Sequence, residues 1–378
     1  MNKRKLGNTG EEVSILGFGA MRFPLKADGT IDEKPAIEMI HYAIDQGVNY
    51  IDTAWPYHDG ESEPFLGRAL GGGYREKVYL ATKLPSWKIK RPEDFEYFLD
   101  QQLLRLNTEV IDFYLVHAIN KKTWHHNLLK NGLFSFLDRA LASKKVKYVG
   151  FSFHDELSLF KEIVDAYPWS FTQIQFNYLD HDYQAGLKGL YYARDRGLGI
   201  IVMEPLRGGG LAGKQPADIA ALWEGAASQR TPVQWALEYV WNYPQVDLVL
   251  SGMSSLEQVK ENIEIASRAT PNALTREEIQ TVYAVKAAYL SRLINQCTTC
   301  GYCMPCPYEV NIPGAFKIFN DGHLFEQLDT FKEKYLREVP RDNRASQCVA
   351  CGQCEPQCPQ NISIIDDLKK VALAFESQ

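Results

Sequence analysis

The feature that most constrains the fold is a regular alternation of short apolar runs with amphipathic stretches, from the N-terminus to about residue 290. Several runs, such as IDFYLVH and LGIIVM, are apolar throughout, which is typical of parallel strands covered on both faces. The stretches between them, such as KPAIEMIHYAIDQG, repeat apolar residues every three or four positions, which predicts helices. We expect eight strands, at Ser14–Gly19, Val48–Thr53, Val78–Lys83, Ile111–His117, Lys147–Ser152, Phe171–Gln175, Gly199–Met203 and Asp247–Ser251.

Eight strand–helix alternations predict an α/β protein, and a (β/α)₈ TIM barrel is the architecture that they favour. A doubly wound open sheet is the alternative, but no GxGxxG motif follows the first strand, which disfavours a dinucleotide-binding sheet of that type. The barrel is expected to occupy residues 1–290. A small, mainly helical domain, residues 291–378, is expected after a boundary near Ser291.

Composition and charge narrow the class of function. The chain has 378 residues, 45% of them hydrophobic, and a formal net charge of −6, which argues against nucleic acid as a partner. The basic N-terminus, MNKRKLGNTGEEVSILGFG, lacks the apolar core of a signal peptide. No stretch approaches the ~20 apolar residues of a membrane helix. We therefore expect a cytoplasmic protein with no membrane partner.

Four polar residues stand where the early strands end or just after them. Asp52, Lys83 and His117 close three consecutive predicted strands, and Tyr57 follows the first of these. On the rim of a parallel barrel these side chains would meet. An ammonium beside a phenol would lower the pKa of the phenol toward neutrality, a carboxylate would hold the ammonium, and an imidazole could hydrogen-bond a carbonyl oxygen. Such a set donates a proton to a carbonyl that receives hydride.

These residues carry a resemblance to a known family. The motifs DTAWPYHDGESE, ATK and the His that closes IDFYLVH resemble the catalytic tetrad of the aldo-keto reductases, and the similarity extends from about Lys3 to Arg268. The resemblance implies that Tyr57 is the general acid/base, assisted by Lys83 and Asp52. It also implies that His117 polarises a small-molecule carbonyl substrate and that NADP or NAD is the hydride carrier.

The same resemblance implies a cofactor site assembled from several later segments. YVGFS and TQIQFN are similar to the strands that hold the nicotinamide carboxamide, MEPLRGGGLAGK to the loop over the pyrophosphate, and LSGMSSLEQVKENI to the adenosine-side motif. The glycines of the loop allow close backbone approach, and Arg207 and Lys214 offer cations to phosphate. The implied cofactor-binding residues are Met21, Asp52, Ser152, Gln173, Met203, Pro205, Leu206, Arg207, Gly208, Lys214, Gly252, Ser254, Gln258, Glu261 and Asn262.

Some positions depart from the family pattern. Phe153 follows the carboxamide serine, where relatives commonly have Asn, and Met203 replaces an aromatic residue behind the nicotinamide. Gly252 and Gln258 stand where NADPH-preferring relatives often carry Lys and Arg. These differences weaken the expectation that NADP is preferred over NAD, although the cation of Lys214 is still compatible with NADP.

All eight cysteines lie in the last part of the chain, in two runs. C-x₂-C-x₂-C-x₂-C-P is followed, after a spacer of helical character, by C-x₂-C-x₂-C-x₃-C-P. A chain without an export signal keeps its thiols reduced, so the runs predict a metal site rather than disulfides. The second run has the spacing of bacterial ferredoxins, in which the fourth cysteine ligates the other cluster. The predicted ligands are Cys297, Cys300, Cys303, Cys306, Cys348, Cys351, Cys354 and Cys358.

Two [4Fe–4S] clusters with crosswise fourth ligands are the first interpretation, a single cluster is the fallback, and zinc is the alternative. With the barrel, the runs resemble aldo-keto reductases that carry a C-terminal ferredoxin-type 4Fe–4S domain. Three functions remain open: a carbonyl reductase with structural or sensing clusters, an electron-transfer protein with a redox partner, and a cofactor-binding sensor. The intact set of Tyr57, Lys83 and His117 favours an enzyme.

Overall fold

The structure is a computed structural model and describes residues 1–377. These residues form two compact units: residues 1–212 with 230–275, and residues 213–229 with the chain from residue 276 onward. The first unit contains a closed barrel of eight parallel strands in the order β10-β3-β4-β5-β6-β7-β8-β9. The predicted (β/α)₈ barrel is confirmed, and the open sheet is excluded because β10 pairs with both β3 and β9.

The barrel strands coincide with the eight predicted apolar runs to within a few residues at each end. An antiparallel pair, β1 (Lys3–Lys5) and β2 (Glu12–Ser14), precedes them. The barrel strands are β3 (Leu16–Gly19), β4 (Tyr50–Asp52), β5 (Tyr79–Leu84), β6 (Ile111–Ile119), β7 (Val146–Phe153), β8 (Phe171–Gln175), β9 (Gly199–Met203) and β10 (Leu248–Gly252).

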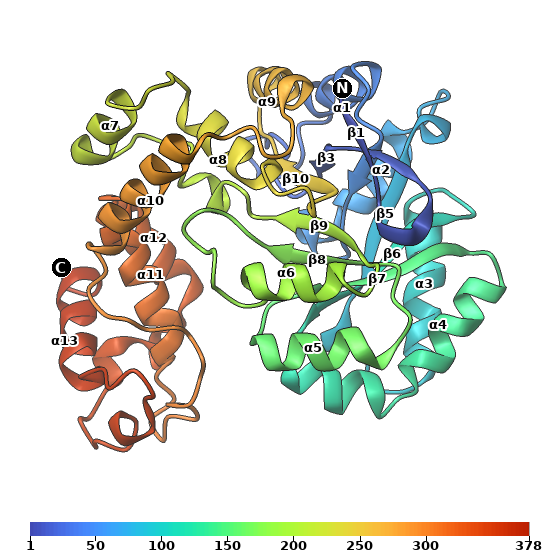
Figure 1. Cartoon of the computed structure of the whole chain (residues 1–378). Coiled ribbons are helices and arrows are strands. Elements are labelled where there is room, and N and C mark those ends of the chain that lie inside the picture. Colours follow the sequence, from blue (N-terminus) through green and yellow to red (C-terminus); the bar gives the residue numbers. More distant parts are fainter. Residues whose placement is uncertain (378) are drawn as a thin grey trace. The chain divides into compact units, whose positions relative to one another are not determined.

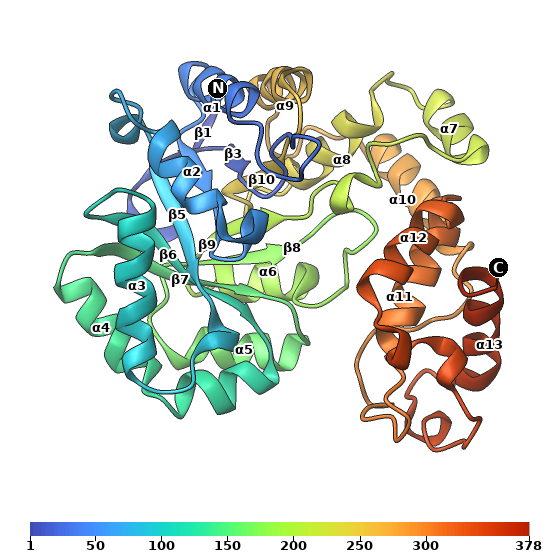
Figure 2. The ribbon, with the colours of Figure 1, turned by 180° about the vertical axis from the view of Figure 1, so that it is seen from behind.

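Helices surround the barrel, as Figure 1 shows for this unit and Figure 2 shows from behind. In the first of them, Ala36, Met39, Ile40 and Ala43 are buried at three- and four-residue spacing, which explains why this segment forms an amphipathic helix against the strands. The helices of this unit are α1 (Glu33–Asp45), α2 (Ser62–Ala69), α3 (Glu93–Arg105), α4 (Leu133–Ala142), α5 (Leu157–Ala166), α6 (Gly186–Arg194), α8 (Pro232–Trp241) and α9 (Leu256–Arg268).

The N-terminal segment closes the bottom of the barrel. Leu6 and Val13 are fully buried and belong to one cluster with the inward side chains of the strands. In that cluster the ring of Phe113 lies 5.2 Å from Tyr148 and 5.3 Å from Phe171, measured between ring centroids. Large rings therefore fill the bottom of the barrel, and the polar strand ends are left for the opposite rim.

A buried carboxylate ties several elements together at the bottom. Asp247, just before β10, accepts hydrogen bonds from the backbone amides of Gly7 and Ile200 and pairs with the guanidinium of Arg194 at 2.8 Å. Burial raises its pKa from 3.8 to about 6, although Arg194 opposes the shift. Charged groups at this end of a TIM barrel serve stability rather than catalysis.

We expect Asp247 to give the fold a measurable pH dependence. Because the native state holds this proton more tightly than the unfolded chain, the stabilisation is complete below about pH 4 and is lost as the pH rises to about 6. A shift of about two units corresponds to about 3 kcal/mol. Urea unfolding of the wild type and of Asp247→Asn between pH 4 and 7 should show their difference in unfolding free energy changing by this order. A difference that is constant over this range would contradict the raised pKa.

The second unit is helical, as the sequence predicted for the spacer between the cysteine runs. α11, α12 and α13 pack against one another around a core that contains Phe316, Phe319, Tyr335 and Val371. The helices of this unit are α7 (Ala217–Glu224), α10 (Arg276–Leu290), α11 (Ile312–Leu324), α12 (Leu328–Glu338) and α13 (Ile364–Phe375). α10 packs against α7 and so belongs to this compact unit. That the iron–sulfur domain itself begins near Ser291 stays a prediction. Over residues 1–377, no helix is long and apolar enough to span a membrane.

Candidate active site and cysteine cavities

The polar residues of the first predicted strands meet at one rim of the barrel. Asp52 is the last residue of β4, while Lys83 and His117 lie near the carboxyl ends of β5 and β6, the next two strands around the barrel. Tyr57 begins the short 3₁₀ segment η2 (Tyr57–Gly60) that follows β4. Parallel neighbours end at the same rim, so residues far apart in sequence become one site.

The ammonium of Lys83 is the centre of this site. It is fully buried and donates to Asp52 Oδ1 at 2.5 Å and to the backbone carbonyl of Thr53 at 2.7 Å. The phenolic oxygen of Tyr57 lies 3.5 Å from the same nitrogen. Burial lowers the pKa of Lys83, but Asp52 and Tyr57 outweigh it and raise that pKa above its ordinary value. Lys83 is therefore a fixed positive charge beside the phenol.

The expectation that Lys83 lowers the pKa of Tyr57 toward neutrality is wrong in its net direction. Burial raises the pKa of Tyr57 above 10, and the opposing effect of Lys83 is smaller. The physical reason is that the phenolate loses its hydration, whereas Asp52 already compensates the charge of Lys83. The phenol consequently keeps its proton at neutral pH, which suits a proton donor.

His117 faces the same space as a neutral ring. Burial, Lys83 and His154 hold the pKa of His117 well below its usual value, so the imidazole is uncharged at neutral pH. Its ring is edge-on to Tyr57, with centroids 6.1 Å apart, and its buried Nδ1 finds no hydrogen-bond partner within residues 1–377. A neutral imidazole of this kind can hydrogen-bond a carbonyl oxygen.

Trp87 is a neighbour of the site that the sequence analysis missed. It lies in the 3₁₀ segment η4 (Ser86–Lys88) after β5, and its ring centroid is 5.2 Å from that of His117. Its side chain is partly exposed and can flank a substrate beside the imidazole. Trp87 follows Lys83 of the ATK motif by only four residues, and this closeness in the sequence is the signal that could have identified it.

The guanidinium of Arg105 stabilises the turn that begins at Tyr57. His58 and Asp59 have left-handed backbone angles, with φ of 52° and 54°, a conformation that side chains other than glycine rarely adopt. The guanidinium of Arg105 donates to the carbonyl of Gly60 and lies 4.1 Å from the ring centroid of Trp55. The end of α3 therefore constrains this strained turn from below.

A buried carboxylate connects that cation to the strand carrying Lys83. Glu63 Oε2 lies 3.3 Å from Arg105 Nε, and Oε1 accepts hydrogen bonds from Thr82 at 2.6 Å and Gln102 at 2.7 Å. The amide of Gln102 also donates to the backbone carbonyl of Lys83 at 3.0 Å. One network thus supports both the turn of Tyr57 and the strand of Lys83.

The residues predicted to hold the nicotinamide lie on neighbouring strands. Ser152 on β7 is in register with Gln173 on β8, and the amide of Gln173 lies 3.4 Å from the sulfur of Met203 on β9. Gln173 Oε1 is buried and has no hydrogen-bond partner within residues 1–377. A carboxamide N–H would satisfy it, so these residues fit the predicted group. Met21 lies just after β3 with an exposed side chain.

The predicted adenosine and diphosphate residues mostly share one cavity. It has a volume of about 360 Å³ and lies at the ends of β9 and β10. Within it, Ser254 N donates to Gln258 Oε1 at 2.8 Å, which braces the loop after β10. The predicted residues that line it are Pro205, Leu206, Gly208, Gly252, Ser254, Gln258, Glu261 and Asn262.

The two cations predicted for the phosphates are not among the residues that line this cavity. Arg207 Nε lies 3.5 Å from Asp180 Oδ2, so its charge is directed to a carboxylate. Lys214 belongs to the second compact unit. Arg22, which the sequence analysis did not select, is the cation that lines the cavity among the described residues.

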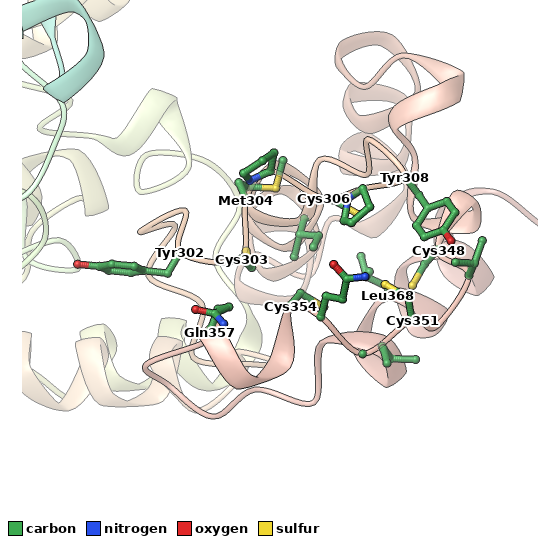
Figure 3. Close-up of a pocket in the computed structure, with 17 residues that line it drawn as sticks. Tyr302, Cys303, Met304, Cys306, Tyr308, Cys348, Cys351, Cys354, Gln357 and Leu368 are labelled. Carbon is green, nitrogen blue, oxygen red and sulfur yellow. The ribbon is translucent and has the colours of Figure 1, made fainter.

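In the second unit the cysteines surround two cavities. The larger, of about 310 Å³, is lined by sulfur-bearing side chains from both runs, as Figure 3 shows. Its cysteines are Cys303, Cys306, Cys348, Cys351 and Cys354. The smaller cavity is lined by Cys297, Cys300, Cys303 and Cys358. Each cavity therefore gathers cysteines from both runs, across the sequence that forms α11 and α12.

The thiols line these cavities without converging on a point. Within residues 1–377, no three His, Cys, Asp or Glu side chains are close enough to bind one metal ion together. All eight cysteines are free of disulfides. Thiols from two runs around a cavity are the donor set that holds an iron–sulfur cluster. Burial raises the pKa of Cys303 to about 11, so binding of a cluster would displace its proton.

Comparison with known proteins identifies the family. The model of the aldo/keto reductase family matches residues 15–286. The chain belongs to this family. A 4Fe-4S dicluster domain matches residues 296–363, so this aldo/keto reductase carries a C-terminal iron–sulfur domain. Family membership makes the chain an oxidoreductase of the aldo/keto reductase type.

Three similar proteins span different shares of this aldo/keto reductase. The uncharacterized oxidoreductase YrpG of Bacillus subtilis (strain 168) is 33% identical over 55% of the chain and 68% of its own length. The probable aldo-keto reductase 1 of Glycine max is 27% identical over 90% of the chain and 97% of its own length. The solved aldo-keto reductase AKR11C1 from Bacillus halodurans (holo form) matches with a TM-score of 0.64 and 26% identity over 75% of the chain and 96% of its own.

The raised pKa of Tyr57 can be measured directly. The difference in phenolate absorbance between the wild type and Tyr57→Phe should titrate above pH 10, because burial disfavours the phenolate. In a Lys83→Met background the same difference should move to higher pH, because the favourable cation is lost. A difference that titrates near neutral pH would show that Lys83 dominates over burial.

Proposed function

We propose that this aldo/keto reductase transfers hydride between NADP or NAD and a small carbonyl compound, with Tyr57 as general acid. The observation that carries the proposal is the phenol of Tyr57, whose pKa is raised by burial and which lies 3.5 Å from an ammonium that Asp52 holds at 2.5 Å. A proton donor beside a fixed positive charge suits reduction of a carbonyl to an alcohol, since negative charge develops on the carbonyl oxygen.

Each residue has a distinct part in this proposal. His117 hydrogen-bonds the carbonyl oxygen and orients it toward the hydroxyl of Tyr57, which gives up its proton as the oxygen becomes an alcohol. Lys83, which Asp52 holds in place, then favours the phenolate that remains. Bound NADPH or NADH supplies the hydride, and Ser152, Gln173 and the residues lining the cavity are its proposed contacts.

Replacement of Tyr57 tests the reaction. With NADPH or NADH and a panel of aldehydes and ketones, Tyr57→Phe should lower kcat by about 10²–10⁴-fold, the usual contribution of general acid catalysis. The matched control is Tyr74→Phe, which removes a phenol that bonds Asp45 on the outer surface and should leave kcat unchanged. Equal turnover by wild type and Tyr57→Phe, or none by wild type, would refute the proposal.

We further propose that the cysteines hold two [4Fe–4S] clusters with crosswise fourth ligands. The larger cavity joins Cys306 to the second run, and the smaller one joins Cys358 to the first run. This grouping is the one that the ferredoxin spacing predicts. Cysteines held in two cavities also favour two clusters over one.

Removing one crosswise cysteine at a time tests the assignment. The wild type should contain about eight iron and eight sulfide atoms per chain. Cys306→Ala should lose the cluster of the larger cavity, and Cys358→Ala that of the smaller one, so each variant should retain about four iron atoms. Anaerobic EPR of the reduced variants should show two different residual signals. Bound zinc, or about four iron atoms in the wild type, would contradict two clusters.

An electron-transfer role is the second candidate, and one feature favours it. Cys300 and Cys351 are exposed, as are Tyr302 and Tyr308 beside them, so the clusters would lie near solvent and within reach of a redox partner protein. Retention of carbonyl reduction after the clusters are lost would separate the electron-transfer role of the clusters from the reductase role of the barrel.

A cytoplasmic location and a sensor role for the barrel stay predictions.

A further inference from the structure

The cavity at the ends of β9 and β10 has an unusual balance of charge for a site proposed to hold a dinucleotide. Two acids, Glu204 and Glu261, line it. The two loop cations selected from the sequence, Arg207 and Lys214, do not line it. A dinucleotide brings at least two negative charges to such a cavity, so a cation must come from another segment.

Arg22 comes from such a segment and crosses the cavity. It follows β3, and its aliphatic stem lies over Gly252 at the end of β10. A Cβ built on Gly252 would approach Cγ of Arg22 at 3.2 Å and Cδ at 3.4 Å. At the far end, Nη2 of Arg22 lies 3.4 Å from the position of a Cβ on Gly208, in the turn after β9.

The guanidinium of Arg22 is available to a ligand. Its side chain is exposed, and within residues 1–377 it forms no ion pair and no side-chain hydrogen bond. Glu204 Oε2 lies 3.7 Å from the same Cβ position on Gly208, so a carboxylate is close by and its repulsion of phosphate needs to be offset. Gly208 and Gly209 have φ of 66° and 97°, and glycines in this conformation allow a ligand to approach the backbone closely.

We propose that Arg22 binds the diphosphate of the dinucleotide and that Gly252 is small because the stem of Arg22 occupies the space of a larger side chain. The inference rests on the proposed function and names the residue that supplies the phosphate cation. The fork of an arginine matches two phosphate oxygens, and Nη2 of this guanidinium lies beside Gly208 in the glycine turn. Because NADP and NAD share the diphosphate, Arg22 contributes equally to the binding of both.

Binding titrations with Arg22→Ala test the inference without requiring a substrate. Fluorescence titrations with NADPH and NADH should show Kd rising by about 10–100-fold, by the same factor for both, as expected for loss of a charge-assisted contact. The salt dependence of both affinities should also become less steep. Arg268→Ala, which removes an exposed arginine that pairs with Glu264, is the matched control and should leave both affinities unchanged.

A second substitution tests the packing of the stem. Gly252→Ala should weaken binding in the wild type, because the new methyl group displaces the stem of Arg22, but should have little effect in the Arg22→Ala background. Such non-additivity is the mark of two residues in direct contact. Far-UV circular dichroism of each variant checks that the barrel remains folded.

The outcomes separate the two proposals. A wild type that binds both dinucleotides while Arg22→Ala binds them equally well overturns the role of Arg22 and leaves the proposed function standing. A loss confined to NADPH also overturns it, because that result assigns Arg22 to the 2′-phosphate. A wild type that binds neither dinucleotide overturns the proposed function itself.

Discussion

The buried ammonium of Lys83 is the interaction on which the catalytic rim depends. A charge with no exposed surface is tolerated in a barrel only when it is paired, and removal of one partner of a buried pair typically costs about 3–5 kcal/mol. Asp52 can pair with it because β4 and β5 are parallel neighbours, with Asp52 in register with Ala81. The same pair sets the electrostatic environment of Tyr57, so stability and the proposed chemistry share one contact.

The support behind that pair extends into the helices. Glu63 on α2 and Gln102 on α3 are fully buried and hydrogen-bonded to each other, and together with Arg105 they hold the left-handed turn after Tyr57. Strain of this kind persists only when the surrounding structure fixes it. The helices α2 and α3 therefore cover the strands and also fix the position of the Tyr57 phenol relative to Lys83.

In both compact units, the fold brings together functional residues that are far apart in the sequence. In the barrel, adjacent strand ends bring together residues that are separated in sequence. In the second unit, α11, α12 and α13 form the packed core, and six of the eight cysteines, all except the exposed Cys300 and Cys351, are partly buried against it. A small apolar core gives the loops fixed ends, so the cysteines can surround cavities of defined size.

The sequence by itself determined the barrel, the candidate residues at the strand ends and the two cysteine runs, because hydrophobic periodicity and ligand spacing are local properties. Tertiary structure decided which groups face each other. It showed that burial has a larger effect on the pKa of Tyr57 than Lys83 has, and that Arg207 forms an ion pair with Asp180. It also showed that Arg22 lines the cavity at the ends of β9 and β10. Desolvation and side-chain direction depend on what packs around a residue in space, which no local pattern contains.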